Sequence, residues 1–470
     1  MNHGVYVSEQ ATSVSTPNVA ASGIPFVVGV APVQSAAKAA KPGVPVMCRS
    51  WDEAVQQLGY SKDWKTYTLC EFMHSHFELY GCQPVIFVNV LDISTMKESV
   101  EAADLTVTDH KVQLPIAAIN NETLVVKAAG GSGGSLVLDK DYSTYYDGEN
   151  LVIETIADGD CHDAGQLNVA YTKATPASVT EVNIATAMES VELCLTTLGT
   201  VPDLICAPGY SHKPTVAAVM ATKASGINGL FRAKALIDID SSSGGAITYT
   251  AVQEKMKASN LTDKDDICCW PMVKSHGNTY HMSTHLAGLM AQVDTKNGCP
   301  YESPSNKPMQ VDALCLEDGT EVVLTHAQAN SLNSIGVVTA LNFNGWVAWG
   351  NYTACYPDNT DIKDNLIPVS RMFDWVANSL VRTFWSKLDR PMNRRLIDTV
   401  LDASNIWLNG LTGAGYLLGA RAVMLEAENP MENLMAGIIK LHIYMTPPAP
   451  AQEIDFILEY DASYVSALQG

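Results

Sequence analysis

The chain has 470 residues, of which 47% are apolar and only 17% charged, so it can bury several hydrophobic cores and is unlike a disordered protein. Its net charge of -21 disfavours direct binding to nucleic acid or to an anionic membrane surface. Eleven cysteines without a CxxC pair argue against a disulfide framework or a zinc ribbon, and indicate synthesis in a reducing cytoplasm. We therefore expect a multidomain protein that needs no cofactor and has no export signal.

The N-terminal part of the sequence predicts an arm followed by a layered domain. Residues 1–22 form the expected arm, with the β-prone residues Val5, Tyr6 and Val7 near its start. From residue 23 onward, apolar strand runs alternate with amphipathic helical segments. This alternation predicts an α/β layer, which we assign to a discontinuous, outer middle domain over 23–104 and 174–340.

Residues 105–173 have a different pattern. Short β-prone runs are separated by turn sequences such as Gly130-Gly131-Ser132-Gly133-Gly134, and no helical period is present. We interpret this segment as a small all-β module inserted into the α/β domain.

The next expected unit is a C-terminal α/β domain over 341–446, so the fold class is multidomain α/β (α+β). It begins at a stretch rich in Asn, Gly and aromatic residues and continues through two long helices. At its end, Ile439, Leu441 and Ile443 alternate with polar residues, which predicts a half-buried strand.

Residues 447–470 predict a proline spacer followed by a C-terminal arm. After the spacer, Ile454, Phe456, Leu458 and Tyr460 alternate along a second expected strand. Six residues in the polyproline conformation extend roughly 19 Å, so the spacer can carry this strand away from its own domain. Detached strands at both ends of the chain can add to the sheet edges of neighbouring copies, with Ile439, Leu441 and Ile443 as the acceptor. Pairing within one subunit is the alternative, and the pattern leaves both open.

Short motifs that occur in order along the chain resemble those of the tail sheath proteins of contractile phages and R-type bacteriocin particles. They are Gly4-Val5-Tyr6-Val7, Phe26-Val27-Val28-Gly29-Val30-Ala31, Asp147-Gly148-Glu149-Asn150-Leu151, Cys269-Trp270-Pro271, Asn333-Ser334-Ile335-Gly336 and Gly345-Trp346-Val347-Ala348-Trp349-Gly350. The resemblance covers nearly the whole chain. One departure is Asn351, where such families usually carry arginine.

The resemblance implies a structural subunit that is not an enzyme. It implies stacked hexameric rings around a tail tube, terminal arms exchanged between copies, and contraction triggered by a baseplate. The implied partners are copies of the chain, the tube protein, and the baseplate and tail terminator proteins. The particle would be made in the bacterial cytoplasm and released by lysis. The alternatives are a non-contractile self-assembling scaffold and an α/β enzyme without a recognisable site.

Catalytic motifs are incomplete. Ser211 follows an apolar run as in a nucleophile elbow, but Lys213 stands where the second glycine is required. His281 and His285 have the spacing of a zinc protease pair, but Met282 replaces the catalytic glutamate. We expect a strand-following loop and ordinary helix positions, respectively.

One stretch of this acidic chain is basic. Between Arg371 and Arg395, six basic residues face two acidic ones, a local net charge of +4. A solvated face with local ion pairs is one interpretation. The other is that Arg390, Arg394 and Arg395 contact an acidic surface on the tube or on a neighbouring subunit.

Overall fold

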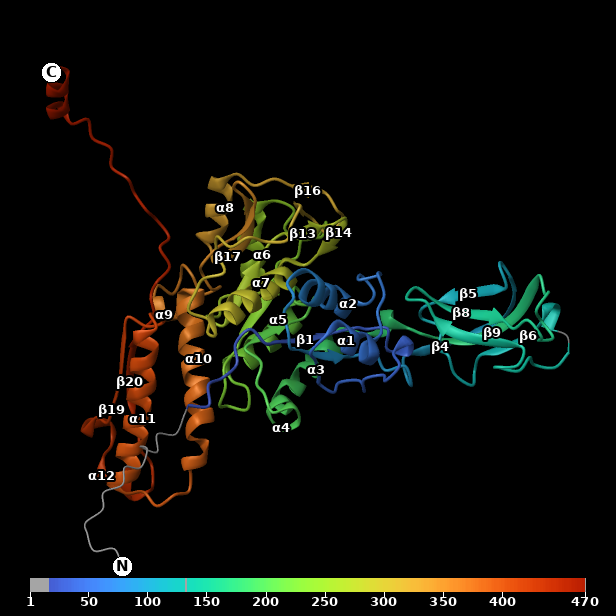
Figure 1. Cartoon of the computed structure of the whole chain (residues 1–470), viewed down its shortest axis with the longest axis horizontal. Helices are drawn as coiled ribbons and strands as arrows, with labels where there is room; N and C mark the ends of the chain where they lie inside the picture. Colours follow the sequence, from blue (N-terminus) through green and yellow to red (C-terminus); the bar gives the residue numbers. More distant parts are fainter. Residues whose placement is uncertain (1–16, 132, 470) are drawn as a thin grey trace, which may run out of the picture.

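The computed structural model describes residues 17–131 and 133–469, and Figure 1 shows three regions. A central sheet body lies between a small β module on one side and a C-terminal helical region on the other. The predicted arm residues Val5, Tyr6 and Val7 lie outside the described residues. Within these, no helix combines the length and apolarity that crossing a bilayer requires.

An eight-stranded sheet forms the centre of the sheet body, in the order β18-β17-β12-β11-β10-β1-β3-β2. Six of its strands are parallel: β1 (Pro25–Gly29), β3 (Val85–Asn89), β10 (Leu204–Cys206), β11 (Lys234–Asp238), β12 (Asp266–Cys269) and β17 (Val337–Asn342). The antiparallel strands β2 (Val46–Cys48) and β18 (Trp346–Trp349) close the two edges. The parallel strands are apolar on both faces, as expected when helices cover a sheet on both sides.

Helices pack on both faces, which confirms the predicted α/β class. One face carries α3 (Glu181–Met188), α5 (Pro214–Ser225) and α6 (Val252–Ala258), and the other carries α1 (Trp51–Leu58), α2 (Thr68–Met73) and α7 (Met282–Asn297). Neighbouring residues of β1 show the two layers, since Val27 and Val28 belong to different cores. The body also contains α4 (Cys194–Leu198), α8 (His326–Asn333) and a small sheet of β13 (Met272–Ser275), β14 (Asn278–Tyr280), β15 (Ala313–Cys315) and β16 (Glu321–Val322).

The β module has its own core between two three-stranded sheets. One sheet contains β4 (Lys97–Thr106), β9 (Gln166–Ala174) and β6 (Val125–Ala128), and the other contains β5 (Lys111–Pro115), β8 (Asn150–Thr155) and β7 (Tyr142–Tyr146). The predicted boundary at residue 105 is wrong, because it cuts β4, whose pairing with β9 begins at Lys97. Because β4 begins with charged residues, the pattern of apolar runs does not indicate a strand there.

The C-terminal region is built on two long helices. It contains α9 (Ile362–Asn365), α10 (Ile367–Phe384), α11 (Arg394–Gly413), β19 (Gly419–Val423), α12 (Met431–Met435) and β20 (His442–Thr446), and a final 3-10 helix spans Ala462–Gln469. The predicted boundary at residue 341 is also wrong. That position lies in the β17–β18 hairpin, whose strands pair from Thr339 to Trp349 within the central sheet.

Candidate assembly interface

The C-terminal sheet has only two strands, β19 and β20, which pair from Gly419 opposite Thr446 to Val423 opposite His442. Its inner face contributes Ala422 and Ile443 to a core with α10 and α11. An isolated two-stranded sheet is only marginally stable, so this one depends on its helical support and on any strand added to it.

The outer edge of β19 is occupied by a side chain of α11. The Asn405 amide donates to the carbonyl oxygen of Ala422 at 3.0 Å, and its oxygen accepts from the Ala422 amide nitrogen at 2.8 Å. Asn405 thus takes the two main-chain groups that an added strand would use. Sequence reasoning missed this residue, because a helical asparagine gives no signal of a partner 17 positions away.

The outer edge of β20 is open. In an antiparallel pair of strands, directly opposite residues alternate along the strands. In one kind of pair the N–H and C=O groups of both residues point toward the partner strand, and in the next kind they point away from it. Since the groups of Ala422 face away from β20, those of the opposite Ile443 face away from β19, as do those of Met445 two residues on. No hydrogen bond to these outward groups occurs among residues 17–131 and 133–469.

The strand predicted over 439–445 is shorter than expected. Ile443 lies in β20, but Ile439 and Leu441 precede its first residue, His442. The reason is that the Lys440 main chain bonds to the side chain of Asn429, with the Lys440 amide donating at 2.8 Å and its carbonyl accepting at 2.9 Å. Of the three predicted acceptor residues, only Ile443 therefore lies in this strand.

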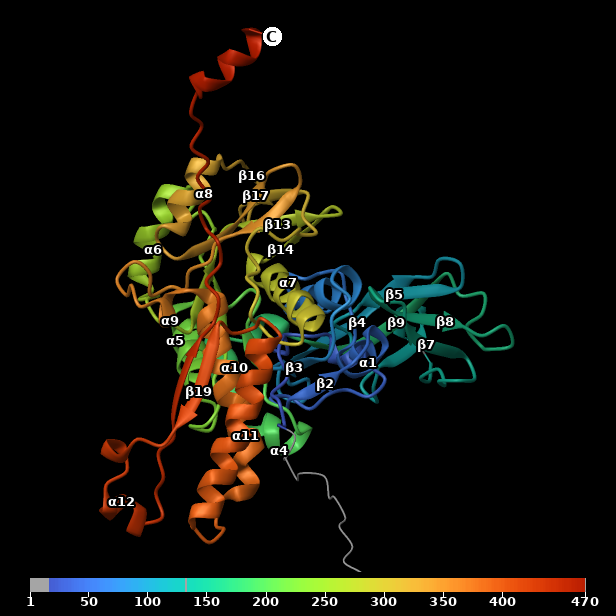
Figure 2. The same ribbon diagram turned by 60° about the vertical axis from the view of Figure 1, so that its left-hand side comes forward.

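The C-terminal arm leaves the body directly after β20 and extends away from it (Figure 2). Ile454, Phe456, Leu458 and Tyr460 are 71–95% exposed and have no regular secondary structure, so the predicted strand is absent from the isolated chain. A strand needs a partner to satisfy its main-chain groups, and this segment has none within its own subunit as described.

The N-terminal segment is anchored on α10 as far back as Asn18. The amide nitrogens of Asn18 and Ala20 donate to the hydroxyls of Thr383 and Ser379 at 3.0 and 2.9 Å, and the Trp375 indole donates to the Ala20 carbonyl at 2.9 Å. Two residues of extended chain span about the same distance as four residues of helix. The spacing between Asn18 and Ala20 therefore matches that between Thr383 and Ser379.

Three ion pairs, formed by two buried basic residues, join α10 to the sheet body. Arg371 donates to Asp294 at 3.1 Å and to Asp203 at 2.8 Å, and it is only 3% exposed. Lys234, at the start of β11, lies 2.9 Å from Asp374 on α10. Arg371 therefore does not belong to the surface patch that the basic run predicted.

The remaining basic residues gather at the turn between α10 and α11. Arg390, Arg394 and Arg395 are exposed there, and Arg394 pairs with Asp398 of its own helix at 2.9 Å. Trp385 and Leu388 are each 58% exposed in the same turn. We call residues 385–395 the basic turn, which presents apolar and cationic side chains together.

The motifs considered for catalysis have structural roles. Ser211 is buried and donates to the Asp238 carboxylate at 2.9 Å. His281 precedes α7 and pairs with Glu71, whereas His285 is buried beside the Tyr80 hydroxyl, so they do not form a zinc pair. In the part of the chain that the structure describes, no three His, Cys, Asp or Glu side chains are placed to hold a metal.

Comparisons with known proteins add sequence relatives along the whole chain. A tail sheath protein of Burkholderia phage BcepMu is 25% identical over 491 residues, covering 100% of this chain and 98% of that protein. A tail sheath protein of Escherichia phage P2 is 24% identical over 43% of this chain and 50% of its own length. No protein-family model matches.

Solved structures of sheath proteins share the fold. The sheath of the extracellular contractile injection system PVC in its contracted state has a TM-score of 0.60 at 16% identity, with 98% of each chain covered. A chain of the anti-feeding prophage baseplate gives 0.58 at 16% identity, covering 98% of this chain and 99% of its own. This chain is thus similar to tail sheath proteins in sequence over its full length, and it shares the fold of a solved contractile injection system sheath.

Proposed function

We propose that copies of this chain exchange terminal strands, assemble into stacked hexameric rings around a tail tube, and contract to drive the tube through a target envelope. The observation that carries the proposal is an exposed apolar arm next to a two-stranded sheet with one open edge. The sheet body and β module would lie on the outside of the particle, and the C-terminal region would face the tube. Baseplate and tail terminator proteins would contact the two ends of the stack. The subunit would be made in the bacterial cytoplasm and released in the particle by lysis.

The C-terminal arm of one copy would add to β20 of another. The outward main-chain groups of Ile443 and Met445 provide hydrogen bonds, and Phe456 and Leu458 provide apolar surface. Burying one such side chain is worth about 1.5–3 kcal/mol, so the alternating residues together favour docking and set its register. The N-terminal arm residues Val5, Tyr6 and Val7 would be donated in the same way.

Both arms provide a length of chain for reaching a neighbour. Seven residues lie between Thr446 and Ile454, and the eight steps correspond to about 25 Å at about 3.1 Å per residue. Nine residues lie between Ser8 and the anchored Asn18, and the ten steps could span about 33 Å at about 3.3 Å per residue. Such tethers would let rigid subunits rotate past one another during contraction without breaking the strand contacts.

The basic turn is the proposed contact to the tube or to a neighbouring subunit. Its exposed Arg390 and Arg395 can meet acidic side chains, while Trp385 and Leu388 supply apolar area. Complementary charge at such a contact would set the register and increase the association rate more than the affinity.

The strand exchange is tested by replacing Met445 with proline. Proline removes the outward amide that the docked strand needs but leaves the hydrogen bonds between β19 and β20, which Met445 does not supply. Met445→Ala is the matched control, because it removes the same side chain and keeps the amide. We expect negative-stain microscopy with the tube to show sheathed cylinders for Met445→Ala and none for Met445→Pro. Normal cylinders from Met445→Pro would refute docking at β20.

A further inference from the structure

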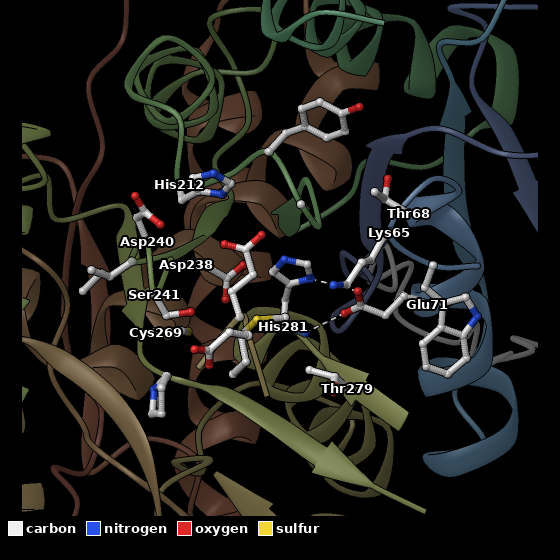
Figure 3. Close-up of a pocket in the computed structure, with 18 of the residues that line it drawn as sticks. Lys65, Thr68, Glu71, His212, Asp238, Asp240, Ser241, Cys269, Thr279 and His281 are labelled. Atoms are coloured by element: carbon white, nitrogen blue, oxygen red, sulfur yellow. Dashed lines mark hydrogen bonds and ion pairs between the residues drawn. The ribbon is translucent and has the colours of Figure 1, made fainter. Parts of the chain in front are cut away.

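A cavity of about 420 Å³ lies outside the carboxyl ends of β10, β11 and β12 (Figure 3). Gly209, Asp238 and Cys269, at or just after these strand ends, line it. The strand order reverses next to it, because the chain passes from β1 to β3 on one side and returns with β10 on the other. Open α/β sheets bind ligands in the crevice at this point of reversal, and the cavity has the size of a small-molecule site.

A buried ion pair places a cation in this cavity. The Glu71 carboxylate accepts from the His281 ring at Nδ1 at 2.8 Å and from its amide nitrogen at 2.7 Å. Burial opposes a charge on His281, but Glu71 outweighs it and raises the pKa to about 9. The other ring nitrogen, Nε2, has no hydrogen bond to any described residue, so its N–H is available to a ligand. Lys65 lines the same side.

The opposite wall is acidic. Figure 3 shows Asp240 and Ser241 across from Lys65 and Glu71, with His281 between them. Burial opposes the charge on Asp240, but hydrogen bonds from Ser242 outweigh it and lower its pKa. Glu317 also lines the cavity. The site therefore has a hydrogen-bond-donating cation on one side and carboxylates on the other.

Two aromatic side chains complete the lining. Trp64 and Tyr210 contribute ring surface to the same cavity. A guanidinium group stacks on such rings and binds carboxylates with two parallel hydrogen bonds. An ammonium group would use only the carboxylates.

We propose that this cavity binds a small dipolar ligand of amino-acid size, with a carboxylate at His281 and Lys65 and a guanidinium group at Asp240 and Glu317. Neither strand exchange nor contraction requires such a site, so this inference goes beyond the proposed function. A bound ligand would connect the segments that precede α2 and α7 with the loops after β11 and β15, and so stabilise the sheet body by mass action.

Calorimetric titration of the full chain with three probes tests the proposal. L-Arginine carries both groups, agmatine lacks the carboxylate, and glutarate lacks the guanidinium group. We expect saturable binding of one L-arginine per chain, with agmatine weaker by about tenfold or more because one charge-assisted contact is lost. Glutarate should show no saturable heat. Equal binding of agmatine and L-arginine, or no saturable heat from either at millimolar concentration, would overturn the proposal.

A pair of charge-matched variants locates the site. Asp240→Asn with Glu317→Gln removes two carboxylates from the cavity and should weaken L-arginine binding by about tenfold or more. Asp158→Asn with Asp163→Asn changes the net charge equally in exposed positions of the β module and should leave binding unchanged. Equal affinity in the two double variants would also refute the site. Particle assembly with the tube provides a separate readout, since the arm proposal does not depend on this cavity.

Discussion

The sheet body buries the apolar residues of its strands, whereas the C-terminal region leaves those of its arm exposed. In the sheet body, β1, β3 and β11 are buried along their whole length and paired on both sides. In the C-terminal region, the sheet stops at two strands, one edge is open, and the arm exposes its apolar residues. The first region pairs its strands within the subunit, whereas the second leaves the surface that we propose other copies cover.

The largest expected effect on the free energy of unfolding distinguishes two phenylalanines, one in each region. Phe87 is 0% exposed in β3, so Phe87→Ala should lower the free energy of unfolding by about 3–5 kcal/mol. Phe456 is 81% exposed, so Phe456→Ala should change it by less than about 0.5 kcal/mol but impair assembly. Urea denaturation and negative-stain microscopy measure the two outcomes. A large loss of subunit stability in Phe456→Ala would show that the arm packs on its own subunit.

A slightly smaller effect is expected where the two regions meet. Arg371→Met leaves the Asp203 and Asp294 carboxylates buried without their cation, which should cost about 3 kcal/mol of unfolding free energy. Arg382→Met, at a less buried position of the same helix, is the control. It should lower the free energy of unfolding by less than about 0.5 kcal/mol. Equal losses in urea denaturation would mean that the ion pairs do not hold α10 to the body.

Acid should weaken the sheet body through two buried histidines. Burial, with some repulsion from neighbouring histidines, lowers the pKa of His76 and His285 to about 3. The unfolded chain takes up these protons near pH 6.5 and the folded chain does not, so stability is complete above that pH and falls as the pH drops toward 3.

Each of these histidines should contribute a slope of about 1.4 kcal/mol per pH unit within this window. His76→Phe should therefore reduce the pH dependence measured by urea denaturation between pH 6 and 4. His326→Gln, at an exposed position on α8, should leave it unchanged. An unchanged slope in His76→Phe would mean that His76 is protonated in the folded chain.

The smallest effect on the subunit is expected at the basic turn. Arg394→Glu with Arg395→Glu should change the unfolding free energy by less than about 0.5 kcal/mol, because both side chains are exposed. The same variant should weaken assembly of sheathed particles at physiological salt, with the defect smaller at high salt. Normal assembly of this variant would refute the proposed contact.

The sequence predicted elements whose signal is local. The alternating strands and helices of the middle domain and the two long helices of the C-terminal domain were found because their apolar periods are set within one element. The sequence did not predict elements whose position or length depends on a partner that is distant along the chain. The β17–β18 hairpin joins the central sheet through β12, and β4 begins among charged residues because β9 pairs with it.

The candidate interface was predicted only in part, because some of its features also depend on residues that are distant along the chain. The alternation of Ile454 to Tyr460 is visible in the sequence, but this segment has no regular secondary structure in the isolated chain. The blocking of β19 by Asn405 and the shortening of β20 by Asn429 depend on side-chain bonds to the main chain across 17 and 11 positions. The burial of Arg371 against two aspartates depends on contacts 77 and 168 positions apart.

In the proposed exchange, the block that Asn405 places on β19 leaves each copy one acceptor edge for its one C-terminal strand. A contact of this kind is heterologous, because the surface given differs from the surface received. Repeated from copy to copy in one direction, it either closes a ring or continues as a helix. A polymer built in this way has polarity, with an unused strand at one end and an unfilled edge at the other.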